Sequence, residues 1–411
     1  MKKIFCLLLI IIFLSGCTNE SMEVKKESYL TLDEMVEDIK YLENTIINTH
    51  PKFHNKESIK KYQCFIDKLA GQINDNMTEN QFYFIVSQGL AYIKDGHTSV
   101  DIYARTFKSI NAKFIWIDEN LYIKENTKEL SKGDEILEIC GKNPKRILDE
   151  MKKVISTENE YWFKFKTQQL LPTRVYLDYF NLLRNDTVNM KITKKNGVIK
   201  NVTLKVNKEI KLIDSYNFDN SYDINHDNNI GILKLNNLSY LEDNINLIYE
   251  FYQKVYKESI NKIVIDIRNS SGGTSTIIDE ILKYYPVNPI IHLNNHKIEN
   301  ENYDVVYQGN TYVAISKESF SSASALSGIF KYNDVGLVIG EPTGGSTICY
   351  GNTELFELPN SKIKYNVASQ KFTIPVDGLY KNSIYPHVYI PYTFEDLINN
   401  NDPVIEWVLE Q

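Results

Sequence analysis

Residues 262–273 read Lys262-Ile263-Val264-Ile265-Asp266-Ile267-Arg268-Asn269-Ser270-Ser271-Gly272-Gly273. The apolar run that opens this stretch predicts a strand buried on both faces, as in a parallel sheet covered by helices. The glycine pair that closes it predicts a turn whose backbone N–H groups can approach another group closely, because glycine carries no Cβ. A helix is expected directly after Gly273.

The chain continues this alternation of strand and helix on both sides of residues 262–273. We expect further strands and helices from residue 230 onward, in chain order a strand at 230–235, a helix at 244–256, a strand at 312–315, a helix after Ser322 and a strand at 337–339. Continuous apolar strands separated by helices predict an α/β sheet buried on both faces. The fold class is therefore predicted to be α/β.

The residues before position 211 show two other patterns, a helical one followed by a β-rich one. From Tyr29 to about Ile93 apolar residues recur at helical spacing, and Thr31 with Glu34 predicts a capping box. Short β-like runs follow up to Asn207, interrupted by a helix predicted from Pro144 to about Ile155. The runs lie at residues 114–117, 121–123, 135–139, 188–192 and 202–206.

The N-terminus predicts a processed leader. A basic Met1-Lys2-Lys3 start precedes the apolar run Ile4–Leu14, which is shorter than the about 20 apolar residues that a membrane-spanning helix needs. The run ends in Leu14-Ser15-Gly16-Cys17, which resembles the bacterial lipobox. We expect a signal peptide at 1–16, a lipid on Cys17 and a polar tether at 17–27. The alternative is a plain secretory signal in which Cys17 is incidental.

Composition excludes several functions. Lys and Arg number 46 against 53 Asp and Glu, a net charge of −7, which argues against nucleic-acid binding. Outside the leader and Cys17, the cysteines are widely spaced and form no CxxC pair, which argues against a disulfide framework and a zinc site. No metal and no cofactor is expected.

A serine-rich turn contains the candidate nucleophile. The segment Ser319-Phe320-Ser321-Ser322-Ala323-Ser324-Ala325 lies between a predicted strand and a predicted helix. A serine there has free helix N–H donors beside it, which an acyl-transfer nucleophile needs for the developing oxyanion. The alternative is that these serines only cap the helix.

Three segments taken together resemble the C-terminal processing (tail-specific) serine peptidase family. Residues 266–273 match its DLRxNxGG motif with Ser270 for the usual Asn, residues 319–324 match TFSSAE with Ser324 for Glu, and residues 338–345 match VGEPTGG. The resemblance implies a crotonase/ClpP-like catalytic domain with Ser321 as nucleophile. It also implies an oxyanion hole formed by the Ser322 N–H and that of Gly272 or Gly273.

The family offers two kinds of base for such a serine. One branch of the family has a Lys after the GEPT motif, but Ser346 stands at that position here. The other branch, which includes the tricorn core protease, uses a His in a DGHT-like segment, and Asp95-Gly96-His97-Thr98 fits this form. The resemblance implies His97 as the base. Without it, a lone histidine in a loop is more often a surface or structural residue. Asp377 and Asp95 are candidates for the group that orients it.

The middle of the chain resembles a PDZ domain. Lys132–Lys142 is similar to the segment GDEILxINGK, and PDZ domains bind peptides as an added strand. We therefore expect a helical region at 28–99, a PDZ-like β-rich domain at 100–210 and a catalytic domain at 211–411. Peptide capture by the middle domain is the weaker part of this prediction.

The expected function is peptide-bond hydrolysis by a serine peptidase that is lipid-anchored at the outer face of the bacterial cell membrane. Its partners would be a polypeptide substrate and the membrane. A catalytically inactive relative that binds peptides or proteins is the alternative, because Ser324 and Ser346 depart from the family pattern. A thioesterase-like hydrolase is a third reading, which turnover of peptide against thioester would separate.

Overall fold

The computed structural model describes residues 30–103 and 105–411. The leader, Cys17 and the tether predicted from the sequence lie outside these residues. In the described part of the chain, no helix combines the length and the apolar character needed to cross a bilayer.

The N-terminal region is helical, as its sequence predicts. Helices α1 (Leu32–Thr49), α2 (Lys56–Ala70) and α3 (Glu79–Ala91) pack together, with a short 3-10 turn at Pro51–Phe53. Thr31 forms the predicted capping box with Glu34, and Thr78 forms another with Gln81. The two boxes fix where α1 and α3 begin.

The β-rich middle region is an antiparallel sheet with the strand order β2-β7-β6-β5-β4-β3. Its strands are β2 (Thr106–Ile110), β3 (Phe114–Ile117), β4 (Asn120–Ile123), β5 (Glu135–Ile139), β6 (Thr187–Thr193) and β7 (Ile199–Lys211). Helices α4 (Pro144–Met151), α5 (Glu160–Leu170) and α6 (Arg174–Tyr179) lie between β5 and β6 in the chain. The helix predicted up to Ile155 ends at Met151.

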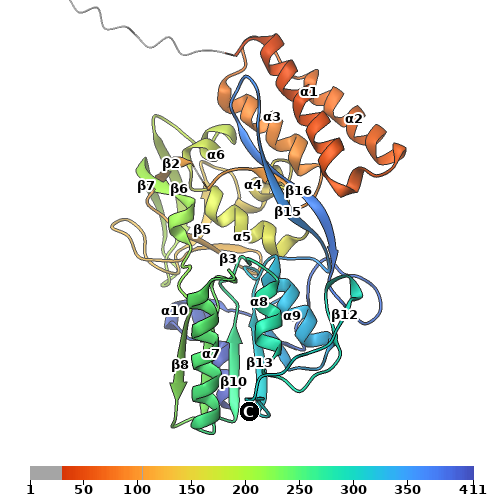
Figure 1. Cartoon of the computed structure of the whole chain (residues 1–411). Helices are drawn as coiled ribbons and strands as arrows, with labels where there is room; N and C mark the ends of the chain where they lie inside the picture. Colours follow the sequence, from red (N-terminus) through yellow and green to blue (C-terminus); the bar gives the residue numbers. More distant parts are fainter. Residues whose placement is uncertain (1–29, 104) are drawn as a thin grey trace, which may run out of the picture.

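The C-terminal region holds the predicted α/β sheet, seen in the lower part of Figure 1. Its strand order is β17-β14-β13-β10-β9-β8, and every pairing except β8–β9 is parallel. The strands are β8 (Ser221–Asn225), β9 (Ile230–Lys234), β10 (Lys262–Asp266), β13 (Asn310–Ile315), β14 (Leu337–Gly340) and β17 (Val388–Tyr389). The helices of this region are α7 (Glu242–Lys257), α8 (Thr276–Leu282), α9 (Ser322–Tyr332), α10 (Phe394–Asn399) and α11 (Pro403–Leu409). A short hairpin adds β11 (Ile290–Ile291) and β12 (Lys297–Ile298).

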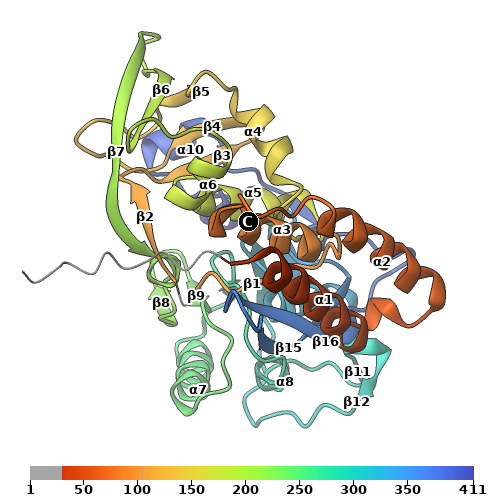
Figure 2. The same ribbon diagram turned by 90° about the horizontal axis from the view of Figure 1, so that it is seen from above.

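A long hairpin joins the α/β region to the N-terminal helices. Strands β15 (Ile348–Glu357) and β16 (Lys364–Thr373) run from the α/β region to the N-terminal helices (Figure 1), and α1 lies against β16 (Figure 2). The short strand β1 (Ser99–Val100) pairs with β16. The hydrophobic core of the helices accordingly includes Tyr365 and Val367.

Candidate active site

The site lies where two parallel strands end. Strands β10 and β13 are neighbours with Asp266 opposite Ala314, so the turns that follow them meet at one edge of the sheet. The Phe320 N–H donates to the Ser270 carbonyl oxygen at 3.0 Å and joins the two turns. Ser319 Oγ also donates to the Ile267 carbonyl oxygen, at 2.8 Å. These bonds bring the glycine turn and the serine turn side by side.

Ser321 stands directly before helix α9 in a rare backbone conformation. Its φ is 54° and its ψ is −124°, a combination that serine adopts only when its surroundings enforce it. The N–H groups of the first turn of α9 lie beside it, at the positive end of the helix dipole. Ser321 is thus held at a position that favours negative charge.

His97 reaches Ser321 from the N-terminal region of the chain. The loop between α3 and β1 places His97 Nε2 3.0 Å from Ser321 Oγ, across 224 residues of sequence. The imidazole stacks on Phe320 with ring centroids 4.6 Å apart, and Phe320 stacks on Trp162 of α5 at 4.1 Å. The ring of His97 is therefore held on one face by aromatic packing.

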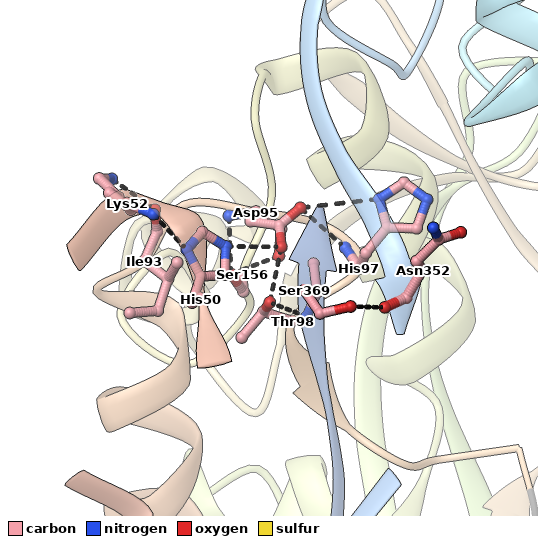
Figure 3. A network of polar contacts seen from close by, with 10 residues as sticks. His50, Lys52, Ile93, Asp95, His97, Thr98, Ser156, Asn352 and Ser369 are labelled. Atoms are coloured by element: carbon pink, nitrogen blue, oxygen red, sulfur yellow. Dashed lines mark hydrogen bonds and ion pairs between the residues drawn. The ribbon is translucent and has the colours of Figure 1, made fainter. Parts of the chain in front are cut away.

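Asp95 lies between His97 and His50, as Figure 3 shows. Its Oδ1 accepts the His97 N–H at 3.1 Å and lies 3.6 Å from His97 Nδ1. Its Oδ2 lies 3.2 Å from His50 Nε2 and accepts the Thr98 hydroxyl at 2.6 Å. Burial raises the pKa of Asp95, but the hydrogen bonds from these neighbours outweigh it and hold the pKa well below its usual range. Asp95 is accordingly a carboxylate at neutral pH.

A second carboxyl group, that of Glu158, lies in the same place. Oxygen and nitrogen atoms of Asp95, His97 and Glu158 all lie within 4.8 Å of one another. This is the one group of described residues close enough together to be considered for a metal ion, but its histidine already faces Ser321 through Nε2. Burial, followed by the charge of Asp95, raises the pKa of Glu158 well above its usual range.

Asp377, the other candidate from the sequence, is not brought to His97. It is exposed in the loop after β16. Its charge opposes the lowering of the Lys331 pKa that burial causes. Asp95 takes the position beside the imidazole because it lies two residues before His97 in the same buried turn. Neither His50 nor Glu158 carries a motif that would have revealed it in the sequence.

The predicted oxyanion hole residues lie next to Ser321. A Cβ added to Gly272 would lie 2.7 Å from Ser321 Cβ, so only glycine fits there, and its φ is +104°. The Gly272 N–H is directed at Ser270 Oγ, at 3.4 Å, whereas the N–H groups of Gly273 and Ser322 have no hydrogen-bond partner within the described residues. Gly273 and Ser322 thus offer the two free donors, with Gly272 as the close-packed residue between them.

The positions that depart from the family pattern have structural contacts. Ser346 Oγ donates to the Lys381 carbonyl oxygen at 3.0 Å, and Ser324 Oγ donates to that of Ser319 at 2.9 Å. The lysines further along, Lys362 and Lys364, bind Pro359 O and Glu357 at the far end of the hairpin. No lysine of the described chain has a hydrogen bond to Ser321.

A groove opens beside the site, between the β-rich sheet and the α/β region. It has a volume of about 480 Å³. Asn269 and Glu318 contribute to its lining from the glycine turn and the serine turn, and Phe114 and Gln168 from the middle region.

Comparison with known proteins identifies the family of one region and the fold of the chain. Residues 229–390 match peptidase family S41. Mature CPAF complexed with lactacystin is similar over 92% of this chain and 97% of its own, with a TM-score of 0.71 and 14% identity. Mature CPAF alone covers 92% of this chain and 96% of its own at a TM-score of 0.70 and 13% identity.

A putative peptidase from Parabacteroides merdae has the same overall arrangement. It is similar over 91% of this chain and 96% of its own, with a TM-score of 0.50 and 16% identity. At these identities the structural likeness establishes the fold, and the family match identifies the region that contains Ser321 and the glycine turn. The chain thus contains a peptidase family S41 region at residues 229–390 and is a serine-type peptidase.

Proposed function

We propose that this serine peptidase uses Ser321 as its nucleophile and His97 as its general base, and that it works from a lipid anchor outside the cytoplasm. The observation that carries the catalytic assignment is the 3.0 Å distance between His97 Nε2 and Ser321 Oγ. This is within the range over which a base takes a proton from a nucleophile.

The proton and electron movements follow from this contact. Ser321 Oγ attacks the carbonyl carbon of the scissile peptide bond while its proton passes to His97 Nε2. His97 then gives that proton to the leaving amine, and water repeats the sequence on the acyl-enzyme. The oxyanion accepts hydrogen bonds from the N–H groups of Ser322 and Gly273, which are free for this purpose.

The groove supports a polypeptide as the substrate. Asn269 and Glu318, which line it, stand within three residues of Gly272 and of Ser321 in the two turns of the site. An extended chain lying in the groove would therefore reach the nucleophile. The PDZ-like character of the middle region remains a prediction from its sequence.

The alternative, an inactive relative, rests on Ser346 and Ser324. Both hydroxyls are engaged with backbone carbonyls, so neither supplies a base. The His97–Ser321 contact favours the active peptidase, because this pair makes a lysine at residue 346 unnecessary.

Covalent labelling with a fluorophosphonate probe tests the catalytic assignment. We expect the wild-type protein to be labelled at Ser321, and His97→Ala to lower the labelling rate and kcat/KM by about 1,000-fold or more, the loss typical of an essential base. Lys362→Ala is the matched control and should keep both rates, since its ammonium group binds Pro359 O. Absence of labelling in a folded wild-type protein would establish the inactive relative instead.

The lipid anchor is proposed from Leu14-Ser15-Gly16-Cys17. A diacylglyceryl group carries two acyl chains, which hold a protein stably at a membrane where one chain is marginal. Mass spectrometry of the mature N-terminus should find this group on Cys17, and Cys17→Ser should release the protein from the membrane fraction. A Cys17→Ser protein that stays in that fraction would contradict the proposal.

A further inference from the structure

One buried carboxyl group near the base has no role in the mechanism above. Both carboxyl oxygens of Glu158 are shielded from solvent and have no hydrogen-bond partner in the described residues, and the same is true of His97 Nδ1. Buried polar atoms are nearly always hydrogen-bonded, so three unpaired ones side by side point to a functional arrangement.

Gly96 explains how Glu158 can lie so close to the site. A Cβ added to Gly96 would lie 2.8 Å from Glu158 Oε2, and equally close to Phe320 Cζ and Trp162 Nε1. The carboxyl group therefore packs directly on the backbone between Asp95 and His97. Any larger residue at position 96 would push it out.

The two carboxyl groups cannot both be charged in this place. Like charges in a buried site disfavour each other, so one proton is retained by the pair. Asp95 accepts hydrogen bonds from the Thr98 hydroxyl and from the His97 backbone N–H, whereas Glu158 accepts none. The charge therefore resides on Asp95 and the proton on Glu158.

Other titratable groups surround the pair. His50 and Lys52 approach from the turn after α1, with His50 Nε2 on Asp95 Oδ2 and Lys52 Nζ on the Ile93 carbonyl oxygen. Cys349 and Tyr350 approach from β15, where burial and the neighbouring carboxyl groups raise the pKa of the Cys349 thiol to about 12. The hydrogen bond from His50 helps to hold the pKa of Asp95 low, so Asp95 carries the negative charge, whereas the Cys349 thiol stays neutral.

We propose that Glu158 is a positioning residue that works as a neutral carboxylic acid beside the Asp95 carboxylate, so that His97 Nδ1 faces a single negative charge. This inference rests on the proposed function of His97. One charge orients the Nδ1–H toward Asp95 and leaves the Nε2 lone pair for Ser321. A second charge would stabilise the imidazolium ion and hold the proton that the base must pass on.

The proposal makes Glu158 a substitute for Asp95 when the latter is lost. In Asp95→Asn the neighbouring charge is removed, so Glu158 becomes easier to ionise and can face Nδ1 in its place. We expect Glu158→Gln alone to lower kcat/KM between about two- and tenfold, the equivalent of one neutral hydrogen bond. In the Asp95→Asn background the same change should remove at least a further tenfold.

A direct measurement uses ¹³C NMR of glutamate carboxyl groups, with the Glu158→Gln spectrum assigning the Glu158 signal. In the wild-type protein this signal should titrate well above the about 4.3 of an ordinary glutamate, and in Asp95→Asn its midpoint should fall. A merely structural Glu158 would show no such dependence on Asp95. This readout needs no enzymatic activity and no stable Glu158 variant beyond the assignment.

Several results would overturn the proposal. A loss of about 1,000-fold or more in Glu158→Gln would make Glu158 the ionised third residue of a triad. Equal activity of Asp95→Asn with and without Glu158→Gln would leave it a packing residue. A wild-type protein that fluorophosphonate does not label would refute the proposed function, while the NMR titration would still test the proton arrangement.

Discussion

Ser321 has a strained backbone conformation at the site of the proposed chemistry. Its positive φ turns the side chain out of the path of helix α9 and toward His97. Such a conformation is unfavourable by about 1–3 kcal/mol and persists only where neighbouring residues enforce it. Here Gly272 packs against Ser321 Cβ, and the backbone of Phe320 is bound to that of Ser270.

Gly272→Ala tests this packing at the residue scale. The new Cβ would meet Ser321 Cβ and the Phe320 carbonyl oxygen at 2.7 and 2.8 Å, and the φ of +104° is unfavourable for alanine. We expect kcat/KM to fall at least about 100-fold, comparable to the loss of an oxyanion donor. Gly378→Ala is the control, since its φ is also positive at +83° but a Cβ there meets no atom within 4 Å. Equal kinetics of the two variants would contradict the argument.

Helix α5 and its N-cap are the element that supports the imidazole. Asn159 caps the helix and donates through Nδ2 to the Gly344 carbonyl oxygen at 2.9 Å, which ties α5 to the loop after β14. Trp162 in the first turn stacks on Phe320 with an angle of 3° between the rings, and Phe320 stacks on His97. An element of the middle region thus fixes the geometry of a site in the α/β region.

Trp162→Leu should separate this support from general stability. Removing the indole leaves Phe320 free to move, so we expect kcat/KM to fall at least about tenfold, in line with the effect of small misplacements in active sites. Trp407→Leu in α11 is the matched control, because Trp407 packs on Tyr312 away from the site. Both variants should melt at lower temperature in circular dichroism, and only Trp162→Leu should lose activity. A Trp407→Leu protein with the same kinetic loss would contradict this view.

At the scale of elements, the sequence predicted what local rules decide. The capping box at Thr31, the run at Phe114–Ile117 and the strand 262–266 were all readable from spacing and side-chain type. The β15–β16 hairpin was not predicted, because most of β15 is exposed or half-buried and so lacks an alternating apolar pattern. Glu158 could not be found either, since its place beside Asp95 is made by tertiary packing around Gly96.

The whole molecule brings residues of the N-terminal helical region and of the α/β region to one site, and the hairpin connects the two regions. Asp38 of α1 is fully buried and accepts the N–H groups of Asn360 and Ser361, each at 2.8 Å, at the tip between β15 and β16. Further along, the Thr98 hydroxyl accepts the Ala368 N–H at 3.0 Å, directly beside His97. The hairpin therefore links α1, the loop of His97 and the α/β region.

Asp38→Ala should weaken this connection. It leaves two partly buried N–H groups without an acceptor, each unfavourable by about 1–3 kcal/mol, so the melting temperature should fall. Glu37→Ala is the control: Glu37 binds the same Asn360, but through an exposed contact at 3.0 Å, and should have little effect. Thermal melts, and activity measured against temperature, would show the lower stability of Asp38→Ala and the nearly unchanged stability of Glu37→Ala. Equal melting temperatures for the two variants would exclude Asp38 as the main contact at the tip.

The separation of His97 and Ser321 in sequence bears on when this protein can become a peptidase. A chain still on the ribosome contains His97 long before Ser321 has been added, and even the complete unfolded polypeptide has no reactive pair. If the two residues act as proposed, proteolytic capacity is absent throughout synthesis and, on the proposed route, throughout passage across the membrane. On this assignment, folding is the step that creates the reactive pair, so the producing cell is protected until the chain has folded.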